Sequence, residues 1–194
     1  SFRQMKKSII LLLGLLFAVV TLHAQDRPPH PELENPAIQG INKELPRASF
    51  ISYENKELAL KNDKKTSSKL HSLNGTWKFH YAHNLTGRIA GFEELLYNCR
   101  NWDDIQVPGH MQLQGYGTPM YVNQMYPWSG HEYVQPGEIP EHFNPVGSYT
   151  KYFELPEHFV GHTIHLTFDG VESAFAVWMN GMFVGYSEDS FTPS

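Results

Sequence analysis

The sequence predicts an all-β protein, built as a β-sandwich of jelly-roll form. Three observations predict it. Apolar residues alternate with polar ones in several short segments, turn residues separate those segments, and 13 Pro and 15 Gly are scattered along the 194 residues. Apolar residues make up 41% of the chain and charged residues 18%, which indicates a folded domain with a core.

The clearest expected strand covers residues 76–81, where Trp77, Phe79 and Tyr81 alternate with polar residues. This period of two is typical of a half-buried strand. A second short strand is expected from Trp102 to Val107, where Pro108 ends it. Alternation returns from Tyr149 to Leu155.

The C-terminal part predicts further strands. Ile164, Leu166 and Phe168 would share one face of a strand, and a later strand would run from Ala174 to Met179. The dipeptide Asn180-Gly181 then predicts a two-residue hairpin turn, because both positions of a type I′ turn need positive φ. The chain is expected to return antiparallel from Met182 to Tyr186.

Two segments are expected to be loops. Residues 56–69 are polar and rich in lysine, so we expect a solvated loop there. Residues 108–147 are rich in Gly, Pro, Tyr, Gln and His and show little periodicity. Loops this long in a small domain are usually functional.

The N-terminus predicts an export signal. Lys6-Lys7 forms a positive segment, Ile9 to Val20 an apolar one, and Leu22-His23-Ala24 a cleavage site. The alternative is a membrane anchor. The apolar segment, however, is shorter than the about 20 residues that span a bilayer. We therefore expect a signal peptide at residues 1–24, with Met5 as the start.

The rest of the chain divides in two. Residues 25–70 are expected to form an extended arm, rich in Pro at its beginning, and a polar loop. Residues 71–194 are expected to form the β-domain. The chain has one cysteine, Cys99, so no internal disulfide can form, and a buried thiol without a chemical role is expected. The net charge is −5 without a basic stripe, which argues against nucleic-acid binding.

No catalytic pair of acids stands out. A glycoside-hydrolysing pair needs carboxyl groups about 5 Å or about 6.5–9.5 Å apart. The adjacent acids Glu93-Glu94, Asp103-Asp104 and Glu188-Asp189 would point to opposite faces if they lay on strands. His162 and His165 on a strand would also point to opposite faces, which argues against a metal site built from them. No phosphate-binding glycine loop and no G-x-S-x-G motif occurs.

Two polar side chains are better candidates. Asp189 follows an expected buried strand, where a carboxylate can accept sugar hydroxyls or bind a hard cation through oxygen. The alternative is an Asp that caps a turn. Asn123 offers both amide donors and an acceptor, which suits sugar hydroxyls. Its alternative is a turn Asn. Tyr116, Tyr126 and Trp128 would stack on a sugar ring or pack the loop.

The chain resembles the N-terminal sugar-binding region of glycoside hydrolase family 2, and in particular the large bacterial β-galactosidases. The resemblance runs from about residue 32 to residue 194. The matching blocks are Glu34-Asn35-Pro36, Ser72-Leu73-Asn74-Gly75-Thr76-Trp77-Lys78-Phe79, Val107-Pro108, Gln112-x-x-Gly115-Tyr116, Pro119-x-Tyr121-x-Asn123-x-x-Tyr126-Pro127, Gly147-x-Tyr149, Phe168-Asp169-Gly170-Val171-x-Ser173-Ala174-Phe175, Asn180-Gly181-x-x-Val184-Gly185-Tyr186 and Asp189-Ser190.

This resemblance implies a jelly-roll domain of the galactose-binding-domain-like kind, which would end here before its last strands. It implies further domains, among them a TIM barrel that carries both catalytic Glu residues, so no catalytic residue is expected in this chain. Asn123 matches a family Asn that binds sugar hydroxyls. Asp189 matches a family Asp that contacts the sugar and helps to bind Na⁺. Mg²⁺ would be bound by the barrel.

The implied function is the hydrolysis of terminal β-D-galactosides with retention, by an exported, periplasmic enzyme that is a homo-oligomer at full length. No stable membrane insertion is expected. A non-catalytic carbohydrate-binding module stays open, as does a family 2 hydrolase for a β-glucuronide or β-mannoside. Met111 and Gln124 depart from residues common in relatives, which leaves the linkage preference open.

Overall fold

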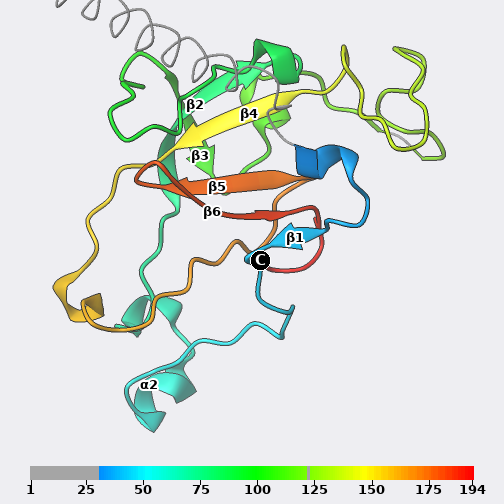
Figure 1. The fold of residues 1–194 in the computed structure, drawn as a ribbon. Helices are drawn as coiled ribbons and strands as arrows, with labels where there is room; N and C mark the ends of the chain where they lie inside the picture. The colour runs from blue at the N-terminus through cyan, green and yellow to red at the C-terminus, as the bar shows by residue number, and fades with distance from the viewer. Residues whose placement is uncertain (1–30, 122) are drawn as a thin grey trace, which may run out of the picture. The chain divides into compact units, whose positions relative to one another are not determined.

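The computed structural model describes residues 31–121 and 123–194, in which short antiparallel strands dominate. The strands are β1 (Gly40–Ile41), β2 (Gly75–Ala82), β3 (Asp103–Val107), β4 (Val146–Thr150), β5 (Phe175–Met179) and β6 (Met182–Ser187) (Figure 1). The helical elements are the α-helix α2 (Lys56–Lys61) and the 3-10 turns η1 (Pro31–Glu34), η2 (Lys64–Thr66), η3 (Leu85–Gly87), η4 (Met111–Gln114) and η5 (Glu157–Phe159). The predicted all-β jelly-roll class is confirmed.

The chain divides into two units, residues 1–38 and 39–194. In the described part of the first unit, η1 is followed by a turn in which the Ala37 amide donates to Asn35 Oδ1 at 3.1 Å. The predicted signal peptide at residues 1–24 lies outside the residues that the structure describes. Within them, no helix is both long and apolar enough to cross a membrane.

The second unit contains two antiparallel sheets of three strands each, in the orders β3-β2-β4 and β1-β6-β5. In the first sheet β2 is central. Phe79 lies opposite Asp103 on one side and opposite Tyr149 on the other. The predicted strands at 76–81 and 102–107 are confirmed. The strand predicted from Tyr149 to Leu155 is β4, which begins earlier and ends at Thr150.

The aromatic face of β2 forms the core of the first sheet. Phe79 is 1% exposed, and its ring lies 4.6 Å from that of Tyr116 and 4.7 Å from that of Tyr149. Gly147, opposite Tyr81, leaves room for these rings, because a Cβ there would lie 2.8 Å from both Phe79 and Tyr149. Alternation along β2 therefore places its aromatic residues as the sequence predicts.

In the second sheet, β5 and β6 form the predicted hairpin. Asn180 has φ 52° and Gly181 φ 82°, so both turn residues have the positive φ that a type I′ turn requires. The short strand β1 pairs with β6 on its other edge, where Gly40 lies opposite Ser187. The Asn42 side chain extends this pairing by donating to the Val184 carbonyl at 2.9 Å.

Phe92 connects the two sheets. Its ring lies 5.5 Å from that of Trp102, which precedes β3, and 6.4 Å from that of Trp178 on β5. A Cβ at Gly181, in the hairpin turn, would lie 3.3 Å from the Leu95 nitrogen, so the turn packs against the segment that carries Phe92. Cys99 is buried, as predicted, and its thiol donates to the Tyr152 hydroxyl at 3.5 Å.

Two predictions of local structure were wrong. Residues 164–168 form no strand in the described structure. Phe168 exchanges two backbone hydrogen bonds with Ser194, of 2.8 and 2.9 Å, and Ile164 is 48% exposed. Alternation predicts an extended backbone, but a strand also needs a partner along its length.

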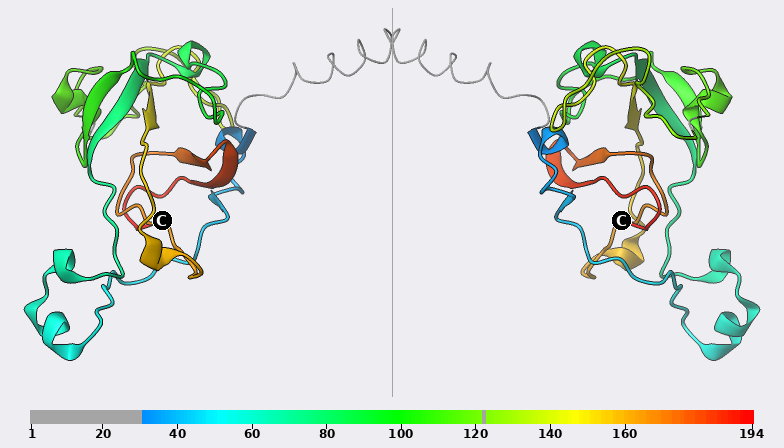
Figure 2. Two further views of the ribbon diagram at one scale, coloured as in Figure 1. Left: turned by 90° about the vertical axis from the view of Figure 1, so that its left-hand side faces the viewer. Right: turned by 90° about the vertical axis from the view of Figure 1, so that its right-hand side faces the viewer.

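The second wrong prediction concerns residues 56–69, which contain the helix α2 rather than a loop alone. Asn55 caps the helix by accepting the Leu58 amide at 2.9 Å, and Asn62 ends it in the left-handed conformation. Most of the segment is solvent-exposed, and Figure 2 shows α2 in both views away from the two sheets. The capping residue Asn55 is the feature from which the helix could be predicted, although the composition of the segment is typical of a loop.

Candidate functional site

Asp189 is the second residue after β6 and lies in a turn that its own carboxylate organises. Oδ1 accepts the Phe191 amide at 3.1 Å, and Oδ2 accepts the hydroxyl of Thr192. Both carboxylate oxygens thus take part in the turn, as in the capping alternative. Each oxygen has a second lone pair, so these contacts leave acceptor capacity for a ligand.

Positive and polar groups surround this turn. The ammonium of Lys43 donates to Ser187 Oγ at 3.0 Å, and the same oxygen accepts the Asp189 amide at 3.4 Å. Ser187 Oγ also lies 2.9 Å from Ser194 Oγ. The antiparallel pairing of β1 with β6 sets Gly40 opposite Ser187. Asn42, with φ 54°, then turns the chain so that the Lys43 side chain lies over Gly40, where a Cβ would meet it at 3.3 Å, and reaches Ser187.

The pKa of the Asp189 carboxyl is lowered from its ordinary value of 3.8. The hydrogen bond from Thr192 is the largest cause, followed by the Phe191 amide, and the Lys43 charge adds to the effect. Partial burial acts in the opposite direction and is outweighed. Asp189 is therefore a carboxylate at neutral pH, as a hydroxyl acceptor or cation ligand must be.

Asn123 lies in an exposed bend of the long loop region before β4. Among the described residues, no hydrogen bond engages its side chain, which leaves the amide donors and the acceptor available. Nor does a described contact join it to Asp189. The structure places one candidate before β4 of the first sheet and the other after β6 of the second, and their meeting at one sugar stays a prediction.

The residues that follow Asn123 form a compact turn. The Tyr126 amide donates to Ser129 Oγ at 3.1 Å, and the Ser129 amide donates to the Tyr126 carbonyl at 2.9 Å. The rings of Tyr126 and Trp128 stack 4.9 Å apart at an angle of 3°. Tyr126 is 67% exposed, so a face of this aromatic pair is open to solvent. Tyr116, in contrast, packs on Phe79 in the core.

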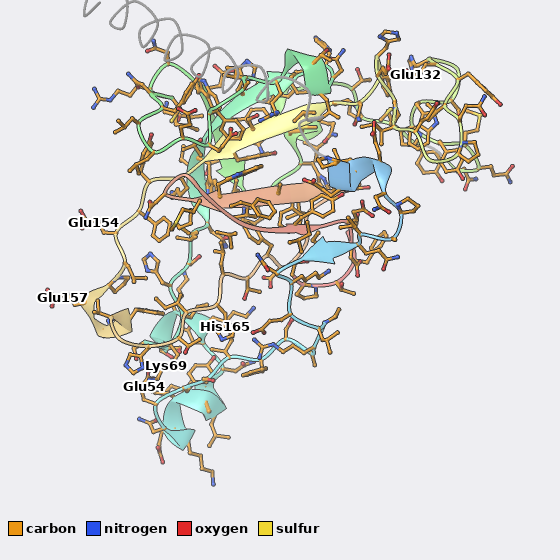
Figure 3. The ribbon with its side chains drawn as sticks, viewed as in Figure 1. Glu54, Lys69, Glu132, Glu154, Glu157 and His165 are labelled. Carbon is orange, nitrogen blue, oxygen red and sulfur yellow. The ribbon has the colours of Figure 1, made fainter. Side chains whose placement is uncertain are left out.

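Glu132 is a feature of this loop that the sequence analysis missed. Its carboxylate accepts three consecutive backbone amides: Glu141 at 3.0 Å, His142 at 3.0 Å and Phe143 at 2.6 Å. Figure 3 shows Glu132 within the loop region that precedes β4. No periodicity marks such a residue. An acid between aromatic residues in a long loop was the one available sign.

The environment of Glu132 keeps it ionised. Burial raises the pKa of its carboxyl, but the amides of Phe143, His142 and Glu141 lower it more, so the pKa lies below its ordinary value of 4.5. The neighbouring ring of His131 stacks on Phe143 at 4.0 Å and 2°. Polar and stacking contacts therefore join the two ends of the segment 131–143.

Two acids of the adjacent pairs considered above lie beside a cation. Glu93 lies 3.7 Å from Arg88, and Asp104 lies 2.8 Å from Lys78. No group of three or more His, Cys, Asp or Glu side chains suited to a metal ion occurs in residues 31–121 and 123–194. The candidate side chains in the described residues are thus polar and aromatic groups on loops.

Comparison with known proteins identifies the family of this antiparallel β-domain. Residues 70–194 match the family described as "Glycosyl hydrolases family 2, sugar binding domain". The chain belongs to this family.

Several relatives carry the name "Beta-galactosidase". The protein of Halalkalibacterium halodurans is 54% identical over 154 residues, which cover 79% of this chain and 15% of the relative. That of Priestia megaterium is 46% identical over 166 residues, or 85% of this chain and 16% of the relative. The "Beta-galactosidase large subunit" of Leuconostoc lactis is 41% identical, with 84% and 27% covered. The chain thus spans about a quarter or less of these relatives' length.

Proposed function

We propose that the whole protein is a β-galactosidase that hydrolyses terminal non-reducing β-D-galactosides with retention, and that this chain supplies part of the wall of its galactose site. The observation that carries the proposal is the family match over residues 70–194, together with relatives named for this activity. The two acids that would perform the reaction are expected in the whole protein's catalytic barrel.

Asn123 is proposed to bind hydroxyl groups of the galactose. Its support is the exposed amide, which no hydrogen bond within residues 31–121 and 123–194 engages, in a loop whose following residues are held in a defined turn. An amide presents donors and an acceptor side by side, which matches a sugar hydroxyl that both donates and accepts.

Asp189 is proposed to accept a sugar hydroxyl and to contribute one ligand to Na⁺. The carboxylate fits a hard cation, because it is ionised and each oxygen keeps a second lone pair beside its turn contact. The remaining Na⁺ ligands and the Mg²⁺ site are expected in the barrel. When bound, the cation would supply a fixed positive charge beside sugar oxygens.

Export to the periplasm and assembly into a homo-oligomer complete the proposal. Export rests on the sequence pattern of residues 5–24, with its positive and apolar segments before Ala24.

The test uses the full-length protein and a chromogenic β-galactoside. Asn123→Ala and Asp189→Ala are each expected to lower kcat/KM at least about tenfold, because an unsatisfied hydrogen bond costs about 1–3 kcal/mol and 1.4 kcal/mol is a factor of ten. Asn101→Ala and Glu154→Ala, an amide and an acid at exposed positions, are the controls. Unchanged kinetics in the first pair would show that the two assignments are wrong.

Parallel assays with a β-glucuronide and a β-mannoside distinguish the related hydrolases. Faster turnover of either than of the galactoside would contradict the substrate proposal. Calorimetric titration with galactose under conditions without turnover separates an enzyme from a pure binding module. Binding without hydrolysis of any of the three substrates would favour the module.

A further inference from the structure

The loop that carries Asn123 has no sheet to hold it. Between Asn123 and β4, the described residues form bends and turns but no strand. Backbone groups outside a sheet are satisfied by turn hydrogen bonds, by side chains or by water. In this loop, one side chain satisfies several of them.

Glu132 satisfies more of these backbone groups than any other side chain of the segment 123–145 for which the structure gives hydrogen bonds. Its two oxygens accept the amides of Glu141, His142 and Phe143, at 3.0, 3.0 and 2.6 Å. Charge-assisted bonds of this type are roughly twice as strong as neutral ones. The carboxylate therefore closes the segment 132–143 into a loop with joined ends.

A short chain of contacts leads from Glu132 back toward Asn123. The amides of His131 and Glu132 donate to the Trp128 carbonyl at 2.9 and 3.2 Å, which forms one turn. The Trp128 ring stacks on Tyr126, three residues after Asn123. These contacts reach Tyr126, and the backbone alone leads from there to Asn123. A displacement of Glu132 is therefore expected to pass through the 126–132 turn to the bend that carries Asn123.

We propose that Glu132 is a positioning residue for sugar binding: it holds the 126–143 segment so that Asn123 meets the galactose hydroxyls. The inference rests on the proposed function. Glu132 touches backbone amides rather than substrate, so it acts through Asn123 and takes no part in the chemistry.

A carboxylate is required for this role. Glu132→Gln keeps one oxygen but replaces the other with an NH₂ group, which faces an amide donor and cannot accept it. Glu138→Gln is the matched control. Glu138 lies in the same loop and accepts a single amide, that of Gln135 at 3.1 Å, within a local turn.

The first measurement is hydrogen exchange of the full-length protein followed by mass spectrometry. Glu132→Gln is expected to accelerate exchange at least about tenfold in peptides covering 126–143 and to leave peptides of β2 and β5 unchanged. Glu138→Gln is expected to leave the amides of 141–143 as in the wild type. Equal exchange in the wild type and Glu132→Gln would overturn the proposal.

The second measurement is a double-mutant cycle on galactoside hydrolysis. Glu132→Gln alone is expected to lower kcat/KM about tenfold, mainly through a higher KM, with an unchanged thermal midpoint. In the Asn123→Ala background the same substitution should have almost no further effect, because coupled residues are not additive. Losses that multiply, or a lowered thermal midpoint that accounts for the loss, would overturn the role of Glu132.

The two proposals fail in different ways. A wild-type protein without galactosidase activity contradicts the proposed function, and the positioning role falls with it, whatever the exchange data show. An active wild type in which Glu132→Gln behaves like Glu138→Gln contradicts only the inference about Glu132.

Discussion

Different interactions stabilise the β3-β2-β4 sheet and the 126–143 segment. In the sheet, alternating aromatic residues pack around Phe79, and the strands satisfy the backbone. In the segment, the Glu132 carboxylate accepts hydrogen bonds from three backbone amides, and two pairs of aromatic rings stack. The sheet depends on buried area and the segment on charge, so they should respond to different perturbations.

The strongest test of the sheet is Phe79→Ala. Removing this 1%-exposed ring leaves a cavity between Tyr116 and Tyr149. Phe→Ala substitutions in cores cost about 3–5 kcal/mol. Urea unfolding followed by circular dichroism should show a much lower midpoint for this domain. A midpoint close to the wild type would mean that the Phe79 cluster is not the core.

Gly147→Ala tests the same core by adding an atom. The new Cβ would lie 2.8 Å from the Phe79 and Tyr149 rings, which are held by their own packing. Overpacking typically costs about 1–3 kcal/mol. Gly170→Ala is the control, because its Cβ would meet nothing closer than 3.6 Å. Equal unfolding midpoints for the two variants would contradict the close packing at Gly147.

Acid is expected to disturb the segment and spare the sheet. The folded pKa of Glu132 is lowered, so its bonds to the amides stabilise the segment above its ordinary pKa of 4.5 and are lost as the pH falls through the lowered value. Exchange in 141–143, corrected for the intrinsic pH dependence, should therefore rise only below about pH 4.5. Glu132→Gln should show no such step, and a step above pH 5 would contradict the lowered pKa.

This contrast explains which parts of the fold can be predicted from the sequence. The strands at 76–81, at 102–107 and on both sides of Asn180-Gly181 follow from period two and from turn chemistry, and the structure confirms them. The strand predicted at 164–168 does not form, because the residues of a segment do not determine whether another strand pairs with it. The helix α2 was missed because one residue, Asn55, begins it.

The candidate site divides in the same way. Residue type and family resemblance predict Asn123 and Asp189 as site residues, and the turn that Asp189 organises agrees with the capping alternative. No pattern in the sequence predicts Glu132 or Lys43. Their roles depend on backbone amides and a hydroxyl brought near by the fold, and no local pattern records such distant contacts.

Because Phe92 lies between Trp102 and Trp178, the intrinsic fluorescence of these two tryptophans depends on the packing around Phe92. Trp178 lies on β5 and Trp102 directly before β3, and a single phenyl ring lies against both. Any event that separates the sheets would expose both indoles to water together and shift their emission to the red. The emission wavelength of these two indoles would then show whether the two sheets are packed together.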